Sequence, residues 1–267
     1  MQLPKNIPKV LYKYRVWEEI GSEHQNQRRI LTETELYFAS ADQFNDPFDT
    51  VLPLRYKDED LTKKKLFKKL WKTGLGKWPD ISKMKLRQDC YDQINTGRFE
   101  NDTYWEQEYP KYKENNLKTF GIISLSHKND NLLMWSHYSN SHNGFCVGLD
   151  TNVLNNLISG SIVKINYQID FPKVPLFAAK DRQLIEILRT KFIDWKYEAE
   201  WRFIKIGVAR KVYKFPENAV LEVILGYKMD EVLKQTITNL VKTNFPNARI
   251  YQSNVNKKIF KLDIIPI

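Results

Sequence analysis

Four short segments of this sequence concentrate side chains able to do chemistry. The first is Tyr12–Arg15, at the end of a stretch in which apolar and basic residues alternate. The guanidinium of Arg15, beside Tyr14, offers a rigid fork of donors that suits a phosphate or a carboxylate. An exposed strand arginine with no ligand is the alternative interpretation.

The second segment is a punctuated turn between Phe44 and Asp49. Asn45, Asp46 and Asp49 supply one amide and two carboxylates within it. These oxygens suit a ribose hydroxyl or a metal ion, although three ligands without a fourth are few for a metal. Asn and Asp also cap turns by themselves, so a rigid turn without a ligand is the alternative.

The third segment pairs two serines with a short helix. Ser124 and Ser126 share one side of a strand, because side chains alternate along it. Trp135, His137 and Tyr138 follow on the helix. A neutral imidazole beside a tyrosine can orient a ligand or shuttle a proton. A histidine–tyrosine hydrogen bond in the core is the alternative.

The fourth segment, Trp195–Arg202, carries two glutamates and an arginine. Strand alternation places Glu198, Glu200 and Arg202 on one side. Two carboxylates about 7 Å apart on a strand suit acid–base chemistry or stabilisation of an oxocarbenium ion. Arg202 would keep one of them ionised. A surface salt-bridge ladder is the alternative, which the flanking tryptophans disfavour.

Strands and helices must position these four segments. Runs of strands with helices at one side predict a single α+β domain over residues 1–267, mostly antiparallel, with a helical insertion at 57–117. The predicted strands span 9–16, 35–39, 119–126, 145–149, 162–167, 199–206, 220–225, 249–252 and 258–264. The predicted helices outside the insertion span 25–32, 131–138, 181–192 and 229–243.

The insertion is rich in lysine and tryptophan, and three helices are predicted in it, near 60–74, 81–97 and 102–115. The first is basic and amphipathic, and its lysines are candidates for contacting nucleic acid: Lys63, Lys64, Lys68, Lys69 and Lys72. The formal net charge of +10 favours a polyanionic partner in the same way. Ordinary solubility is the alternative explanation of both features.

Composition excludes several classes of protein. Two cysteines, Cys90 and Cys146, rule out a disulfide scaffold and a multi-cysteine zinc site. The phosphate-loop, dinucleotide, nucleophile-elbow and His-Glu-x-x-His motifs are all absent from the sequence. No apolar run is long enough to cross a membrane, and residues 1–10 lack the apolar core of a signal peptide. We therefore expect a protein of a reducing cytoplasm.

The four segments, in this order, resemble the bacterial family catalogued as domain of unknown function 2971. The resemblance rests on Leu11–Arg15, Leu36–Asp49, Met134–Leu149 and Trp195–Arg202. Members are similar to proteins carried among bacterial defence and mobile-element genes. The resemblance therefore implies phage defence or a toxin system, with an antitoxin or another defence protein as a partner, but no activity.

A second resemblance, to ADP-ribosyltransferases of the arginine-serine-glutamate type, implies chemistry. That superfamily has a split, mostly antiparallel α+β sheet, and its landmarks are an arginine on the first strand, a Ser-x-Ser and a late Glu-x-Glu. The resemblance implies that Arg15 holds NAD phosphates or ribose and that Ser124 supports the nicotinamide side. Glu200 would stabilise the oxocarbenium and Glu198 would prepare the acceptor. His137 and Tyr138 could instead supply the nicotinamide pocket, as in the histidine-tyrosine-glutamate branch, but they lie after Ser124, whereas that branch has its histidine on the first strand. The resemblance thus gives a set of candidate cofactor-binding residues: Tyr14, Arg15, Ser124, Ser126, Trp135, His137 and Tyr138.

Three hypotheses remain open from the sequence. The first is an NAD-dependent ADP-ribosyltransferase effector acting on nucleic acid. The second is a metal-dependent nuclease, in which His137 and the carboxylates of the second and fourth segments gather divalent ions. The third is a non-catalytic binding or sensor module, in which the glutamates only brace the fold.

Overall fold

The computed structural model describes residues 6–18, 25–53, 55–99 and 119–267. The chain divides into two compact units. The first comprises Met1–Gln43, Thr119–Tyr167 and Ile193–Ile267, and the second comprises Phe44–Lys118 and Gln168–Phe192. The second unit thus begins ahead of the predicted insertion and takes in a later segment as well.

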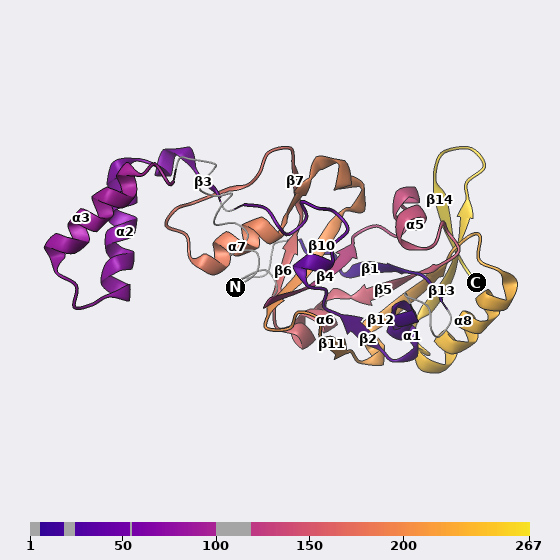
Figure 1. The fold of residues 1–267 in the computed structure, drawn as a ribbon. Helices are drawn as coiled ribbons and strands as arrows, with labels where there is room; N and C mark the ends of the chain where they lie inside the picture. Colours follow the sequence, from indigo (N-terminus) through magenta and orange to yellow (C-terminus); the bar gives the residue numbers. More distant parts are fainter. Residues whose placement is uncertain (1–5, 19–24, 54, 100–118) are drawn as a thin grey trace. The chain divides into compact units, whose positions relative to one another are not determined.

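An eight-stranded, mostly antiparallel sheet forms the first unit (Figure 1). Its order is β14-β13-β12-β5-β1-β4-β10-β6, and only β12 and β13 pair in parallel among its strands. The predicted α+β class with a mostly antiparallel sheet is confirmed. The strands are β1 (Val10–Arg15), β4 (Phe120–Ser126), β5 (Phe145–Asp150), β6 (Ser161–Lys164), β10 (Glu200–Ile206), β12 (Val220–Leu225), β13 (Arg249–Val255) and β14 (Leu262–Pro266).

The sheet splits between β1 and β4. These two strands pair at a single position, Tyr12 opposite Ser126. If their antiparallel register continued, Ile122 would face Val16, but Ile122 instead forms a bridge with Ala39. The segment around Ala39 therefore pairs with β4 beyond the position where the pairing of β1 with β4 ends. Strand β2 (Glu35–Tyr37), which precedes Ala39 in the sequence, pairs with β11 (Val212–Lys214) in a small sheet.

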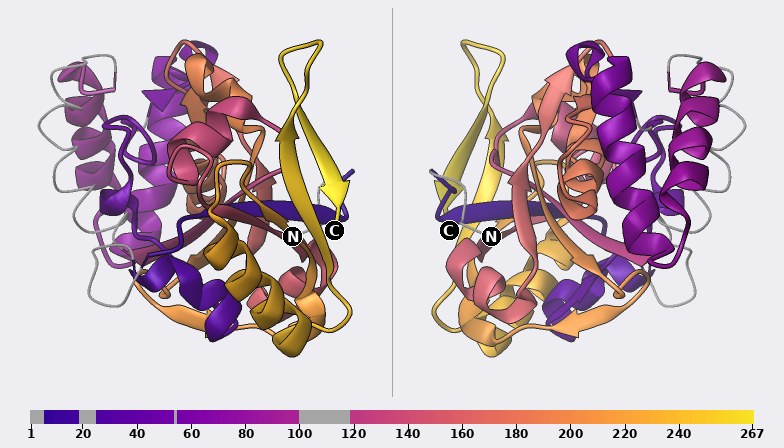
Figure 2. Two further views of the ribbon diagram at one scale, coloured as in Figure 1. Left: turned by 90° about the vertical axis from the view of Figure 1, so that its right-hand side faces the viewer. Right: turned by 90° about the vertical axis from the view of Figure 1, so that its left-hand side faces the viewer.

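Helices cover both faces of this sheet (Figure 1). One face carries the larger core, to which the apolar sides of three helices contribute: α1 (Arg29–Thr32), α6 (Thr151–Ile158) and α8 (Glu231–Asn244). The other face carries a smaller core built from Met134 and Trp135 of α5 (Leu132–Tyr138). The β13–β14 hairpin projects beyond the sheet in Figure 2.

Polar side chains start several of these helices. Asn131 accepts hydrogen bonds from the amides of Leu133 and Met134, and Asp150 caps α6 in the same way. Such caps satisfy amides that a helix leaves unpaired at its start. Short 3₁₀ turns complete the unit: η1 (Gln25–Arg28), η2 (Ala41–Gln43), η5 (Ile193–Glu198) and η6 (Glu217–Ala219).

The second unit is mainly helical over the part described. Thr62 caps α2 (Lys63–Lys77), which packs against α3 (Lys83–Asn95) and confirms two of the predicted helices. The third predicted helix, 102–115, lies outside the described residues. The unit also contains η3 (Asp58–Asp60), α7 (Lys180–Leu188), β9 (Thr190–Phe192) and the parallel pair β3 (Arg55–Tyr56) and β8 (Lys173–Val174).

Several predicted bounds are wrong. The helix predicted at 181–192 ends at Leu188, and the alternating Thr190–Phe192 is the strand β9. The strand predicted at 162–167 divides into β6 and β7 (Asn166–Gln168). Helix α6 was not predicted, although Asp150 and the apolar residues after it carry a helix-start pattern.

Two further features bear on the sequence analysis. Cys90 and Cys146 are both free and buried, as expected for reduced structural cysteines. Over the described ranges, the helices are too short or too polar to cross a bilayer.

Candidate functional site

Two of the predicted residues, Ser126 and Glu200, stand in one row with Tyr12 across three neighbouring strands. Tyr12 of β1 pairs with Ser126 of β4, and Ser126 pairs with Glu200 of β10. Directly paired residues lie on the same face of a sheet, so these three side chains share one face. The row marks the last contact between β1 and β4 before the sheet splits.

Glu200 is bound by an arginine two residues along the same strand. Arg202 donates from Nε to Oε1 at 2.7 Å and from a terminal nitrogen to Oε2 at 3.0 Å. Glu200 is 4% exposed and Arg202 is 0% exposed. The pair is therefore a buried fork, and the interpretation as a surface salt-bridge ladder is wrong.

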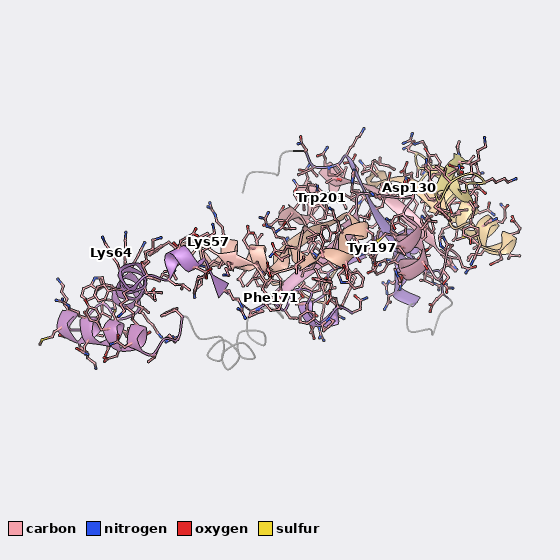
Figure 3. The ribbon with its side chains drawn as sticks, turned by 90° about the horizontal axis from the view of Figure 1, so that it is seen from above. Lys57, Lys64, Asp130, Phe171, Tyr197 and Trp201 are labelled. Atoms are coloured by element: carbon pink, nitrogen blue, oxygen red, sulfur yellow. The ribbon has the colours of Figure 1, made fainter. Side chains whose placement is uncertain are left out.

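Glu198 does not lie on the strand, contrary to the prediction. It ends the 3₁₀ turn η5, and Ala199 adopts a left-handed φ of 45° before β10 begins at Glu200. This bend turns Glu198 inward, where the hydroxyl of Tyr138 donates to its Oε1 at 2.6 Å. Figure 3 labels Tyr197 and Trp201, which flank the two glutamates in sequence.

The bend between the glutamates is fixed by hydrogen bonds. Ser126 donates its hydroxyl to the carbonyl of Glu198 at 2.7 Å and accepts from the amide of Lys128. The hydroxyl of Tyr167 accepts from the amide of Glu200 at 2.8 Å. We call Ser126, Tyr138, Glu198, Glu200 and Arg202 the glutamate cluster. Its polar groups hold one another in place.

Burial raises the pKa values of two tyrosines in this region. It raises the pKa of Tyr138, and the carboxylate of Glu198 raises that pKa further. Burial also raises the pKa of Tyr167. Both hydroxyls therefore stay protonated at neutral pH, and Tyr138 remains a donor to Glu198.

Arg15 lies at the split, in a different environment. It lines a cavity of about 690 Å³ whose other walls are Asn26, Gln27, Arg29, Glu35, Tyr37, Ala39, Gln43 and Val212. Arg29 pairs with Glu35 there at 2.7 Å. Within the described ranges, no hydrogen bond or ion pair of the Arg15 side chain is found. We call this space the Arg15 cavity.

Two cations stand side by side along this part of β1. Burial lowers the pKa of Arg15 to about 10. Burial lowers the pKa of Lys13 well below its usual value, and Arg15 lowers it further, while Glu200 and Glu198 oppose the change. Lys13 donates to the carbonyl of Ser124 across the split. Sequence analysis missed Lys13, whose alternation with Tyr12 and Tyr14 was the available signal.

The three landmarks of the arginine-serine-glutamate pattern do not share one face. Arg15 pairs with Phe145, and Tyr12 lies an odd number of positions away from Arg15. Arg15 therefore points to the face opposite the row of Tyr12, Ser126 and Glu200. Ser124 pairs with Arg202, and its hydroxyl is buried without a hydrogen-bond partner. Neither Ser124 nor Glu200 lines the Arg15 cavity.

The candidate residues on helix α5 lie in different environments. Trp135 is fully buried, donates its indole N–H to the carbonyl of Asn129 and meets the ring of Tyr14 edge-on. Tyr14 in turn donates to the carbonyl of Lys128. Both rings are core residues, and the prediction that they contact a cofactor finds no support in this geometry. His137 is exposed, so it does not make the predicted core hydrogen bond.

The turn of the second segment belongs to the second unit. Asp46 accepts from the amide of Phe48, and the amide of Asp49 donates to the carbonyl of Asp46. Asn45 and Phe48 are both exposed. Asp49 is buried against Lys191 at 3.3 Å. Sequence analysis missed Lys191 because it placed that residue in a helix.

The predicted nucleic-acid-contacting lysines lie on α2. Lys63, Lys64, Lys68 and Lys72 are exposed and Lys69 is half-buried. Burial lowers the pKa of Lys69, and the nearby charges of Lys180 and Lys72 lower it further. Figure 3 labels Lys64 at the start of this helix. Like charges thus gather at this part of the second unit.

A metal site finds no support. In the ranges that the structure describes, no group of three or more His, Cys, Asp or Glu side chains is placed to hold a metal ion. In the glutamate cluster, Tyr138 and Arg202 occupy oxygens that a metal would need.

Comparisons with known proteins give one match. No curated protein and no solved structure matches the chain. Residues 134–203, which carry α5 and the glutamate cluster apart from Ser126, match the family model described as "Protein of unknown function (DUF2971)".

Proposed function

We propose that this protein is an NAD-dependent ADP-ribosyltransferase-like effector of a bacterial defence or toxin system. One observation carries the proposal. The sheet splits directly beside the row of Tyr12, Ser126 and Glu200, and a cavity lies at the split, lined by Arg15, whose side chain has no partner among the described residues. The landmark residues thus fall on the adjacent strands β1, β4 and β10.

The Arg15 cavity fits the phosphates of a dinucleotide. Its volume of about 690 Å³ lies within the usual range of ligand pockets. Arg15 brings a half-buried guanidinium with donors free for an anion, and amide side chains of Asn26, Gln27 and Gln43 line the same space. An arginine fork is the donor best matched to phosphate oxygens.

The chemistry needs a carboxylate near the ribose. When the bond between C1′ and nicotinamide breaks, its electron pair leaves with nicotinamide and positive charge develops on the ribose. A fixed carboxylate stabilises that charge as it develops. Both oxygens of Glu200 accept from Arg202, and Arg15 points to the opposite face of the sheet. The proposal therefore requires Glu200 to exchange Arg202 for the ribose, and NAD to reach through the split between β1 and β4.

The proposed acceptor is nucleic acid. The exposed lysines of α2 and the charge of +10 support a polyanionic target. An antitoxin or another defence protein would hold such an effector inactive, which is part of the same proposal.

The direct experiment uses biotin-labelled NAD. The purified protein is incubated with it and with RNA, DNA or cell lysate, and nicotinamide release is followed in parallel. The proposal predicts released nicotinamide and label on one acceptor class. Neither release nor labelling with any acceptor, for a protein shown to be folded, would contradict it.

A non-catalytic binding module is the second candidate. The pairing of Glu200 with Arg202 favours this candidate, because a buried carboxylate with both oxygens bonded suits a structural role. This reading predicts that the Arg15 cavity binds an anion that the protein never cleaves.

A further inference from the structure

The second unit contains a smaller cavity with an aromatic wall. Its volume is about 260 Å³, and Leu52, Ile169 and three phenylalanines line it, namely Phe48, Phe171 and Phe192. The rings of Phe48 and Phe171 touch, with centroids 6.1 Å apart. Phe48 is 57% exposed, and the other two are also partly open to solvent. Figure 3 labels Phe171.

Exposed aromatic rings around a cavity point to a ligand. A soluble protein rarely leaves several large apolar side chains uncovered together unless they bind something. Here three segments bring these rings together, the turn after Asp46, the stretch at 168–171 and the strand β9.

An ion pair lies among the polar residues that line the same cavity. Lys191 and Asp49 both line it, their side chains lie 3.3 Å apart, and both are almost completely buried. Withdrawing two charges from water costs free energy that a well-packed apolar pair would not cost. The pair also places a donor and an acceptor next to each other, and Gln168, Asp170 and Thr190 add further polar groups to the lining.

The backbone holds Asp49 and Phe48 in place. Asp46 accepts from the amide of Phe48 at 2.9 Å, and its carbonyl accepts from the amide of Asp49 at 3.1 Å. The turn thus directs one aromatic ring and one carboxylate to the cavity. The rigid turn predicted from the sequence serves as the frame of this site.

We infer that this cavity binds a single nucleobase, with its ring against the wall of Phe48 and Phe171 and its polar edge at Lys191 and Asp49. The volume is below that of pockets for drug-sized molecules, so one ring system fills it. A nucleobase carries donors and acceptors side by side on its edge, which a hydrocarbon or a simple indole lacks.

A cation lies next to one ring of the cavity wall. The guanidinium of Arg55 lies 5.7 Å from the centre of the Phe171 ring. A cation beside a stacking surface is the combination by which proteins hold single-stranded nucleic acid without reading its sequence. The inference deepens the proposed nucleic-acid target and rests on it only for the source of the base.

The test measures equilibrium binding by calorimetry without NAD. The ligands are AMP, GMP, CMP and UMP, with ribose 5-phosphate and indole as the ligands that lack a base or its polar edge. Binding of at least one nucleotide, well above both reference ligands, is expected. Equal binding of ribose 5-phosphate, or of indole, would overturn the inference.

Variants locate the site. Phe48→Ala removes an exposed ring and should weaken nucleotide binding about tenfold or more. Trp78→Ala is the matched control, because Trp78 is an exposed aromatic of the same unit that does not line the cavity. Phe48→Trp should restore binding. Equal losses in Phe48→Ala and Trp78→Ala, or none in Phe48→Ala, would contradict the assignment.

A second arm identifies the source of the base. Single-stranded homopolymers are compared with a duplex of the same composition and with the free nucleotide. Tighter binding of single strands, sensitive to Phe48→Ala, assigns a polymer, and equal affinities assign a free nucleotide. Glu200→Gln should bind as the parent does, so a loss of NAD chemistry and a loss of base binding are separable.

Discussion

The glutamate cluster and the Arg15 cavity lie at the same split of the sheet, but they differ in how their charged groups are paired. In the cluster, Arg202 satisfies both oxygens of Glu200, and Tyr138 satisfies an oxygen of Glu198. In the cavity, Arg15 has no hydrogen-bonding partner among the described residues and its pKa is lowered to about 10 by burial.

This difference indicates a structural role for the paired charges of the cluster and a binding role for the cavity. A buried charge with a bidentate partner is held in one geometry, and removing either partner is expensive. A half-buried charge without a counter-ion is already partly desolvated, so the binding of an anion to it is favourable. The cavity is therefore the site prepared for a ligand, and the cluster is a rigid group on the opposite face of the sheet at the same split.

The largest expected effect comes from Glu200→Gln. In the transferase proposal, it removes the carboxylate that stabilises the oxocarbenium, and nicotinamide release should fall by about two to four orders of magnitude. Glu198→Gln should impair transfer to the acceptor more than cleavage by water. Release is measured at saturating NAD and corrected for the folded fraction.

Glu231→Gln provides the control, because Glu231 is an exposed glutamate of the same unit. Glu200→Gln should also lower the melting temperature, because Arg202 is buried and glutamine leaves this guanidinium without an opposite charge. A folded Glu200→Gln protein with the activity of the parent would end the catalytic role of this residue.

The second effect is on stability. Arg202→Met leaves Glu200 as a buried charge without its partner and should lower the free energy of unfolding by about 3–5 kcal/mol. Arg249→Met is the comparison, because Arg249 pairs with Glu222 but is 69% exposed, and it should cost about 0–1 kcal/mol. Urea denaturation measures both. Similar costs for the two variants would show that the cluster is not a rigid buried group.

The third effect is a pH dependence of anion binding. Only the protonated guanidinium of Arg15 attracts an anion, and its pKa is lowered to about 10. Binding of ADP-ribose should therefore be retained at neutral pH and weaken as pH rises through about 10. Titration by calorimetry between pH 7 and pH 11 checks this, and an affinity that does not change over that range would contradict the role of Arg15.

The smallest effect concerns salt. Replacing the exposed lysines Lys63, Lys64, Lys68 and Lys72, together with Lys69, by glutamine should flatten the salt dependence of nucleic-acid binding. Each lysine that contacts a phosphate contributes roughly 0.7 to the logarithmic slope for single strands and 0.9 for duplex DNA. An unchanged slope would show that this helix face is ordinary solvated surface.

The fold was predictable where periodicity is local. The strands at Arg15, Ser126 and Glu200 follow from alternation, and the turn at Asp46 follows from its capping side chain. Glu198 was misplaced because the left-handed conformation of Ala199 interrupts the alternation, and an alanine gives no signal for it.

The pairing of charges was not predictable. Whether Arg15 or Arg202 has a partner depends on strand register and on the bridge between Ala39 and Ile122, which join distant parts of the chain. The sequence places both arginines on strands and treats them alike. Only the three-dimensional arrangement separates the buried pair from the unpaired cation.

The most direct test of this account is the affinity of Arg15→Met for ADP-ribose, measured together with its stability. Loss of a charged donor to phosphate should weaken binding about tenfold to a hundredfold. Stability should be unchanged or higher, because an unpaired, desolvated charge is removed. A variant that binds ADP-ribose as the parent does, or a parent that does not bind it at all, would contradict the claim that Arg15 awaits an anionic ligand.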